Sequence, residues 1–270
     1  MGDEKKDYIL GCDPDELARL ERQHRIWETH TRQLWQRAGF RQHRRMLDLG
    51  CGPGYSTMGL ADVMDDPETL TAIDASQAFG DHLMGQLPAG SPVQFVQGDV
   101  QRLDLQAGFY DAAFARWLFC FLQRPEVVIE QVHRVLRPGG DLVILDYFNY
   151  MSVRLQPWTP ALEKGFRAIH QSLAGSGGSL DIGDVLPGML THAGFEIVDM
   201  MPISEIALPG SPVWVWFDLF RQNFFPGLVK GGYLTAEENA AFERDFEAHG
   251  KRPDSYFFAP PMLGIIARKR

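Results

Sequence analysis

Apolar and polar residues alternate along the first half of the chain in blocks that predict strands and helices in turn. Short apolar runs predict five buried strands, at 44–50, 70–76, 93–100, 110–117 and 141–148. Apolar residues recur with helical spacing before and between these runs, at 13–38, 55–64, 77–87 and 125–136. Strands that alternate with helices are typical of parallel crossovers, so we expect an α/β fold with a doubly wound, Rossmann-like sheet.

The alternation loosens after the fifth strand. Residues 151–180 predict mostly helix with a flexible "GSGGS" turn near the end, 182–194 predict another helix, and 195–208 predict a sixth strand. A long segment at 209–261 is dense in Trp, Phe and Tyr and follows neither period. The final apolar run, 262–270, predicts a last strand, antiparallel in a mostly parallel sheet.

Composition narrows the class of ligand. The chain has 270 residues, of which 45% are hydrophobic and 23% charged, and its formal net charge is -9. A field of this sign repels polyanions, so we expect a small-molecule substrate and no nucleic-acid partner. No apolar run approaches the roughly 18 residues of a transmembrane helix, so we expect no membrane span.

The cysteines and the first residues predict a cytoplasmic protein. Cys12, Cys51 and Cys120 are odd in number and match no metal-ligand spacing, which favours a reducing compartment. The opening "MGDEKKDYILG" has no apolar core of a secretory signal.

The glycines of "LGCGPGYS" (49–56) lie between the first strand and the helix that follows it. Glycines at such a turn let the backbone approach a ligand closely, as in sites for nucleoside triphosphates, dinucleotides and S-adenosylmethionine. A triphosphate loop needs Lys and then Ser or Thr after its last glycine, and here Tyr55 and Ser56 follow. A dinucleotide loop needs a small residue where this chain has Tyr55 or Thr57, which disfavours that class.

A series of motifs then points to the third class. "LDLGCGPG" (47–54) resembles the first motif of class I S-adenosylmethionine-dependent methyltransferases, and further stretches resemble later motifs in order: "QGDV" (97–100), "DAAFARWLFCFL" (111–122) and "VHRVLRPGGDLVI" (132–144). The resemblance covers residues 44–148. It implies a Rossmann-like fold, S-adenosyl-L-methionine as cofactor and S-adenosyl-L-homocysteine as product.

The resemblance also implies which residues hold the cofactor. Asp74 would accept hydrogen bonds from both ribose hydroxyls, Asp99 would accept from the adenine amino group, and Val100 would offer its backbone amide to the ring. The backbone carbonyl of Arg116 would line the methionine end. The remaining predicted contacts of the core are Gly50, Cys51, Gly52, Gly54 and Ala75.

The N-terminal stretch "YILG…ELARLERQ" resembles a narrower set, the ubiquinone/menaquinone-biosynthesis C-methyltransferases and related small-molecule methyltransferases. In that set the N-terminal helix covers the cofactor, and Tyr8 and Gln23 would face its methionine carboxylate. We therefore expect one domain over 1–270, with a helical lid at 1–40, a cofactor-binding core at 41–150, and substrate-covering insertions at 151–180 and 205–261. The aromatic-rich insertion could build a lid, a homodimer surface, or both.

A general base is needed only if the methyl acceptor must lose a proton. Asp146 at the end of the fifth strand is the first candidate and His170 the second, with Tyr147 and Tyr150 nearby. "LDYFNY" offers Asp146 and Asn149 but no third ligand, so we expect no metal.

The substrate class follows from exclusion and from the aromatic segment. The "NPPY"-type loop of nucleic-acid amino-methyltransferases is absent, and an aromatic-rich lid favours a small, largely apolar acceptor such as a quinone, polyketide, terpenoid or aromatic metabolite. Trp214, Trp216, Phe220 and Phe224 fit either core packing or a substrate wall. Two other functions stay open: a non-catalytic module that binds the cofactor or a partner protein, and a nicotinamide-dependent oxidoreductase.

Overall fold

Seven strands form the central sheet of the computed structural model, which describes residues 14–270. Their order across the sheet is β3-β2-β1-β4-β5-β10-β7. Their bounds are β1 (Arg45–Leu49), β2 (Thr69–Asp74), β3 (Val93–Gln97), β4 (Tyr110–Arg116), β5 (Leu136–Tyr147), β7 (Phe195–Ile203) and β10 (Met262–Lys269). The first five strands pair in parallel, whereas β10 runs antiparallel to both β5 and β7. The prediction of a mostly parallel sheet with a last antiparallel strand is confirmed.

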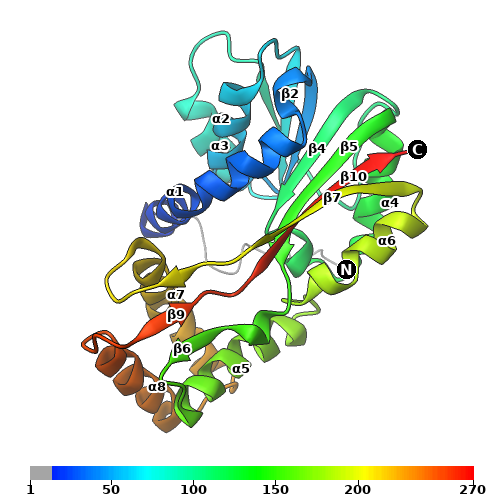
Figure 1. The fold of residues 1–270 in the computed structure, drawn as a ribbon. Coiled ribbons are helices and arrows are strands. Elements are labelled where there is room, and N and C mark those ends of the chain that lie inside the picture. The colour runs from blue at the N-terminus through cyan, green and yellow to red at the C-terminus, as the bar shows by residue number, and fades with distance from the viewer. Residues whose placement is uncertain (1–13) are drawn as a thin grey trace, which may run out of the picture.

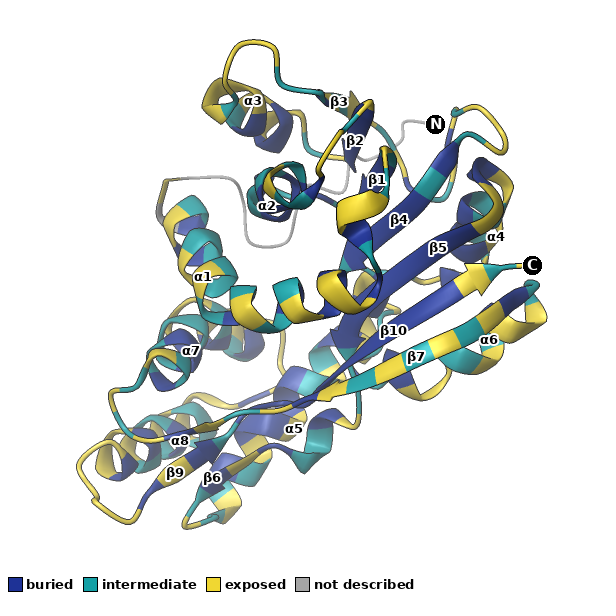
Figure 2. Cartoon of the chain, turned by 45° about the horizontal axis from the view of Figure 1, so that its top comes forward, coloured by how far each residue is buried: buried dark blue, intermediate teal, exposed yellow. Residues whose placement is uncertain are grey.

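Helices cover both faces of this sheet. Helices α1, α2 and α3 lie on one side of it, and α4 and α6 lie on the other (Figures 1 and 2). The central strands are therefore buried on both faces, as parallel strands usually are. The bounds of the helices are α1 (Pro14–Arg37), α2 (Tyr55–Val63), α3 (Gln77–Gln86), α4 (Pro125–Val135), α5 (Pro160–Gly175), α6 (Leu186–His192), α7 (Pro212–Lys230) and α8 (Ala236–His249).

Beyond β5 the structure differs from the expected pattern. The stretch 151–180 was expected to be mostly helical, but it begins with a short strand, β6 (Arg154–Gln156), and only then forms α5. The expected sixth strand, 195–208, is divided into β7 and β8 (Ile206–Ala207). Of the helix expected at 182–194, only α6 is α-helical, after the 3-10 turn η4 (Ile182–Asp184).

A second sheet explains these differences. Strand β9 (Tyr256–Phe258) pairs antiparallel with both β6 and β8, so three segments far apart in sequence form one small sheet. Pairing of this kind depends on partners brought together by the fold, which local periodicity does not report.

The small sheet and helices α5, α7 and α8 form a unit below the central sheet in Figure 1. An aromatic cluster, Phe166, Phe217, Phe242 and Phe257, holds this unit together, with ring centroids 4.8–6.2 Å apart in the contacting pairs. Local signals fix the helix starts: Thr159 caps α5, and Thr235 with Glu238 forms a capping box on α8. The unit lies beyond the carboxyl ends of the parallel strands, where α/β sheets bind ligands.

Candidate active site

A single cavity of about 710 Å³ lies between the carboxyl ends of the central strands and the helical unit. Its volume falls within the range of about 300–1,000 Å³ that is usual for small-molecule sites. One part of its wall comes from the glycine loop, Asp74 and Arg116, and another part comes from α5 and α7. The cavity therefore brings the predicted cofactor-binding residues together with the aromatic segment.

Strand register places the first of these residues side by side. Leu49 of β1 pairs with Ile73 of β2 and with Ala115 of β4. The residues that follow, Gly50, Asp74 and Arg116, consequently leave three neighbouring strands at the same edge of the sheet, and all three line the cavity.

The glycine loop needs its glycines for two different reasons. Gly50, Gly52 and Gly54 all have positive φ angles, of 64°, 54° and 86°. A β-carbon on Gly50 would lie 2.8 Å from Leu118, and one on Gly54 would lie 2.4 Å from Leu83, so a larger residue at either position would clash unless these leucines shifted. A β-carbon on Gly52 would meet no protein atom within 4 Å. Gly52 lines the cavity, so its bare backbone leaves room for a ligand at this point.

Backbone amides next to the glycine loop fix the position of the Asp74 carboxylate. It accepts hydrogen bonds from the amide of Gly52 and the amide of Ser76, both at 2.9 Å. Burial raises the pKa of Asp74, while these two amides oppose the shift. The side chain lines the cavity, and its two oxygens suit a ligand that presents two neighbouring hydroxyls.

The predicted adenine contacts lie at the end of the neighbouring strand. Asp99 and Val100 follow β3; Asp99 is exposed, Val100 is buried, and neither belongs to the cavity wall. The amide of Gly98 donates to the carbonyl of Asp74 at 2.9 Å, which fixes this segment beside β2. Ala75 also connects the ends of β2 and β3, because its carbonyl accepts a hydrogen bond from the Gln97 side chain at 3.1 Å.

Arg116 joins the end of β4 to helix α1. Its guanidinium donates to the Thr31 hydroxyl at 3.2 Å and lies 3.0 Å from Nδ1 of His24. Burial lowers the pKa of Arg116 to about 10, and burial together with the nearby guanidinium lowers the pKa of His24 to about 4. His24 is thus neutral and accepts from Arg116, which remains a cation without a carboxylate partner in residues 14–270.

Helix α1 contributes a second polar group to the cavity. The Gln23 side-chain oxygen accepts from Arg19 at 2.9 Å and from the Trp216 indole at 3.2 Å. Arg19 is itself paired with Glu16 by two contacts of 2.7 Å. The structure thus places Gln23 where helix α1 meets α7, whereas the predicted contact Tyr8 lies outside the described residues.

The two predicted bases do not line the cavity. Asp146 is buried, with a pKa raised by burial to about 6, and its carboxylate accepts from the amides of Cys120 and Tyr147 at 3.2 and 2.9 Å. His170 lies on α5, and its Nε2 atom is 2.7 Å from a carboxylate oxygen of Asp181. Asp146 therefore binds backbone amides and His170 binds a neighbouring carboxylate, and neither side chain lines the cavity.

Aromatic side chains next to these residues do line the cavity. Tyr147 and Tyr150 belong to its wall, together with Trp117, whose backbone has a φ of 51°. A positive φ is uncommon for a bulky residue, and strained residues of this kind cluster at functional sites. In the sequence, only the position of Trp117 directly after a predicted strand could have indicated that it lines the cavity.

Helix α7 settles which aromatic residues face the cavity. Trp216, Phe220 and Phe224 recur every four residues along one face of the helix, and all three belong to the cavity wall. Trp214 does not: it packs against Phe246 of α8, with ring centroids 5.1 Å apart. One side of α7 therefore lines the cavity, and the side that carries Trp214 packs in the core of the helical unit.

A buried acid behind the glycine loop was not predicted from the sequence. Asp48 of β1 accepts a hydrogen bond from the Thr57 hydroxyl of α2 at 2.7 Å. Burial raises the pKa of Asp48 to about 7. This hydrogen bond connects β1, before the glycine loop, to α2, after it. In the sequence, only the acid within "LDLG" could have indicated this contact.

Comparison with known proteins agrees with this geometry. Residues 47–144 match the family model described as a methyltransferase domain. The chain is therefore an S-adenosylmethionine-dependent methyltransferase, similar to the class I enzymes of this kind. Its cofactor is accordingly S-adenosylmethionine, and the open Gly52 backbone beside the Asp74 carboxylate suits a ligand with a ribose.

This methyltransferase is similar to curated enzymes over about two thirds of its length. It is 29% identical to O-methyltransferase cnsE of Penicillium expansum, over 66% of this chain and 62% of that enzyme. It is 26% identical to the ubiquinone/menaquinone biosynthesis C-methyltransferase UbiE of Ectopseudomonas mendocina (strain ymp), over 65% of this chain and 73% of that enzyme.

Solved structures share the fold of this methyltransferase. The [4+2]-cyclase SpnF has a TM-score of 0.57 at 22% identity and covers 89% of this chain and 80% of its own. The YcgJ protein of Bacillus subtilis has a TM-score of 0.59 at 15% identity, with 89% and 99% covered. At such identities the likeness shows the fold alone.

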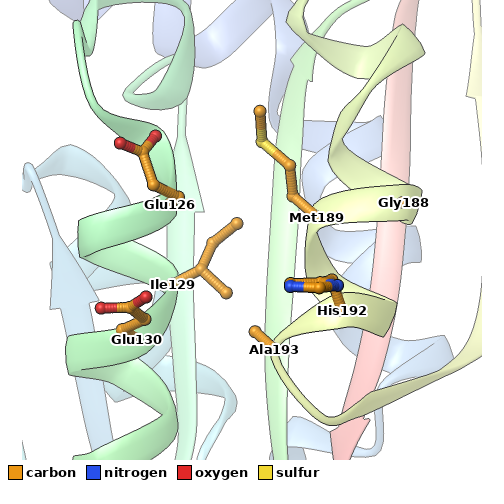
Figure 3. A pocket seen from close by; sticks show the side chains of 7 residues that line it. All are labelled: Glu126, Ile129, Glu130, Gly188, Met189, His192 and Ala193. Carbon is orange, nitrogen blue, oxygen red and sulfur yellow. The ribbon is translucent and has the colours of Figure 1, made fainter.

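A separate cleft of about 520 Å³ lies between α4 and α6, on the other side of the sheet from α1 (Figure 3). Ile129 points across it towards α6, whereas the Glu126 carboxylate points away. Neither here nor elsewhere in residues 14–270 do three or more His, Cys, Asp or Glu side chains gather as metal ligands would. Within the same residues no helix is long and apolar enough to cross a bilayer.

Proposed function

We propose that this methyltransferase transfers the methyl group of S-adenosylmethionine to a small, largely apolar metabolite, such as a quinone, polyketide, terpenoid or aromatic compound. One observation carries the proposal: a single cavity joins the glycine loop and Asp74 to the aromatic face of α7. A methyl donor and an apolar acceptor bound in the two parts of one cavity would meet without crossing water.

The order of the strands suggests how the cofactor would lie. Asp99 and Val100, after β3, would hold the adenine, and Asp74 at the end of β2 would hold the ribose. Gly50 after β1 and Arg116 at the end of β4 would hold the methionine portion. Bound S-adenosylmethionine supplies an activated methyl group. The chain's own residues then orient the two molecules and keep water away.

The names of the relatives support the acceptor class. They include an O-methyltransferase, ubiquinone/menaquinone C-methyltransferases and a sterol 24-C-methyltransferase. The largely apolar wall formed by Trp216, Phe217, Phe220 and Phe224 fits an acceptor of similar polarity. We propose that Asp146 and His170 act by positioning neighbouring groups, since neither side chain reaches the cavity wall. A cytoplasmic location, a single domain and a homodimer stay predictions.

Calorimetric titration with S-adenosylhomocysteine tests the cofactor site. We expect wild type to bind it, and Asp74→Ala to weaken binding by about 1–3 kcal/mol, which is roughly 5- to 150-fold, because a half-buried charged acceptor is lost. Asp81→Ala is the matched control, because Asp81 is an exposed acid on α3 outside the cavity. Equal affinity of the two variants would contradict the proposed role of Asp74.

Transfer of labelled methyl groups to a panel of apolar acceptors tests catalysis. Methylated product supports the proposal. A chain that binds S-adenosylhomocysteine but methylates no acceptor would favour a non-catalytic module, and binding of NADH alone would favour a nicotinamide-dependent oxidoreductase.

A further inference from the structure

Two phenol hydroxyls in the cavity wall have no hydrogen-bond partner among residues 14–270. Tyr147 ends β5, and Tyr150 begins the 3-10 turn η3 (Tyr150–Ser152) directly after it. Both line the cavity, and Tyr150 is only 4% exposed. No hydroxyl, carbonyl or carboxylate in the described part of the chain, residues 14–270, bonds to either Oη atom. Neither Oη is among the fully enclosed polar atoms without a partner, so both open onto space that a ligand or water can enter.

The rings of these tyrosines form an ordered aromatic group with Trp117. Tyr147 is nearly parallel to Trp117, at 25° and a centroid distance of 6.3 Å, and Tyr150 meets Tyr147 edge-on, at 84° and 5.7 Å. The indole of Trp117 donates to the sulfur of Met262 at 3.1 Å, which fixes its orientation. Such a group presents flat apolar faces to the cavity with hydroxyls at its border.

Two carboxylates, those of the buried Asp146 and the half-buried Asp181, accept hydrogen bonds from the backbone of the two tyrosines. The amide of Tyr147 donates to Asp146 at 2.9 Å, and the amide of Tyr150 donates to Asp181 at 2.7 Å. The second oxygen of Asp146 accepts from Cys120, and the second oxygen of Asp181 lies 2.7 Å from His170. The two residues predicted as bases thus fix the positions of two cavity tyrosines.

The charge state of the phenols decides what they can bind. Burial raises the pKa of both hydroxyls above that of an ordinary tyrosine. At neutral pH both are protonated, so they donate hydrogen bonds and do not serve as bases. The part of α7 that lines the same cavity is largely apolar, with Trp216, Phe217 and Phe220 in its wall.

We propose that Tyr147 and Tyr150 determine acceptor specificity by donating hydrogen bonds to a carbonyl or hydroxyl oxygen on a flat ring. The inference rests on the proposed function and narrows its acceptor class to oxygen-bearing planar rings. A hydrocarbon of the same shape would leave both hydroxyls without a partner, and a site built in this way discriminates against such a ligand.

Two probes of equal shape test this inference. Tetramethylbenzoquinone carries two ring oxygens, and tetramethylbenzene has the same methyl-substituted ring without them. Their dissociation constants are measured by calorimetry on protein saturated with S-adenosylhomocysteine, for wild type, Tyr147→Phe, Tyr150→Phe and the double variant. Tyr256→Phe is the matched control, because Tyr256 lies on β9, is 38% exposed and does not line the cavity.

We expect each single variant to weaken quinone binding about 3- to 10-fold and to leave the hydrocarbon unchanged. The control should change neither. Equal shifts for both probes, no shift in any variant, or no quinone binding by wild type that does bind S-adenosylhomocysteine would overturn the inference. Unaltered affinity for S-adenosylhomocysteine in the variants shows that they fold, and its absence in wild type would instead count against the proposed function.

Discussion

Replacing Gly52 by alanine separates the cofactor role of the glycine loop from its structural role. Gly52 and Gly90 both have positive φ angles, of 54° and 81°, and a β-carbon at either position would meet no protein atom within 4 Å. Only Gly52 lines the cavity. Gly90→Ala therefore reproduces the backbone strain of Gly52→Ala far from the ligand.

The expected magnitudes follow from this geometry. Left-handed backbone costs an alanine about 1–2 kcal/mol, so both variants should lose about that much free energy of unfolding. The new methyl group at position 52 would stand where the backbone meets the cofactor, and should weaken S-adenosylhomocysteine binding by at least about 10-fold. Gly54→Ala should lose about 1–3 kcal/mol more stability than either, because its β-carbon would lie 2.4 Å from Leu83.

Denaturant unfolding measures the stabilities, and calorimetric titration with S-adenosylhomocysteine measures the affinities. If Gly52→Ala binds as tightly as Gly90→Ala, the cofactor does not approach the backbone at Gly52 and the reasoning is refuted. If Gly54→Ala is no less stable than the other two, Leu83 yields to the added methyl group and the packing argument is wrong.

Two further predictions concern charges around the loop. Because burial raises the pKa of Asp48 from 3.8 to about 7, wild type should lose stability relative to Asp48→Asn as pH rises through this interval. Thermal unfolding at several pH values would show parallel curves if Asp48 were ionised throughout. Arg116 lines the cavity and forms no ion pair with a carboxylate in residues 14–270, so we expect its guanidinium to attract the carboxylate of the cofactor's methionine portion. Arg116→Met should therefore weaken S-adenosylhomocysteine binding about 10- to 100-fold. Methylthioadenosine, which has no carboxylate, should bind both proteins alike; an equal loss for both ligands would contradict an interaction with the carboxylate.

Local sequence patterns were sufficient for the central sheet. Its strands are short apolar runs separated by helices with their own period and by glycine or proline turns, so each element carries its signal within a few residues. The positions of Gly50, Asp74 and Arg116 followed as well, because the ends of parallel strands must meet at one edge. The sequence by itself therefore determined the fold class and the region of the cofactor site.

Side-chain direction at the end of β5 depended on the tertiary structure. Asp146 and Tyr147 are adjacent and point to opposite sides of the strand. Because β5 is covered on both faces, its apolar run does not show which side opens into the cavity. Only the assembled structure shows that the tyrosine lines the cavity while the acid holds the backbone.

The wall around the acceptor was also decided by contacts between distant segments. Gln23 meets Trp216 across 193 positions of the chain, and Arg154 pairs with Phe258 in a sheet that also takes in β8. Such contacts form because helices and strands bury their remaining apolar faces against one another, and no local period encodes which faces will meet. The sequence determined what the core binds, and the tertiary structure decided which side chains surround the methyl acceptor.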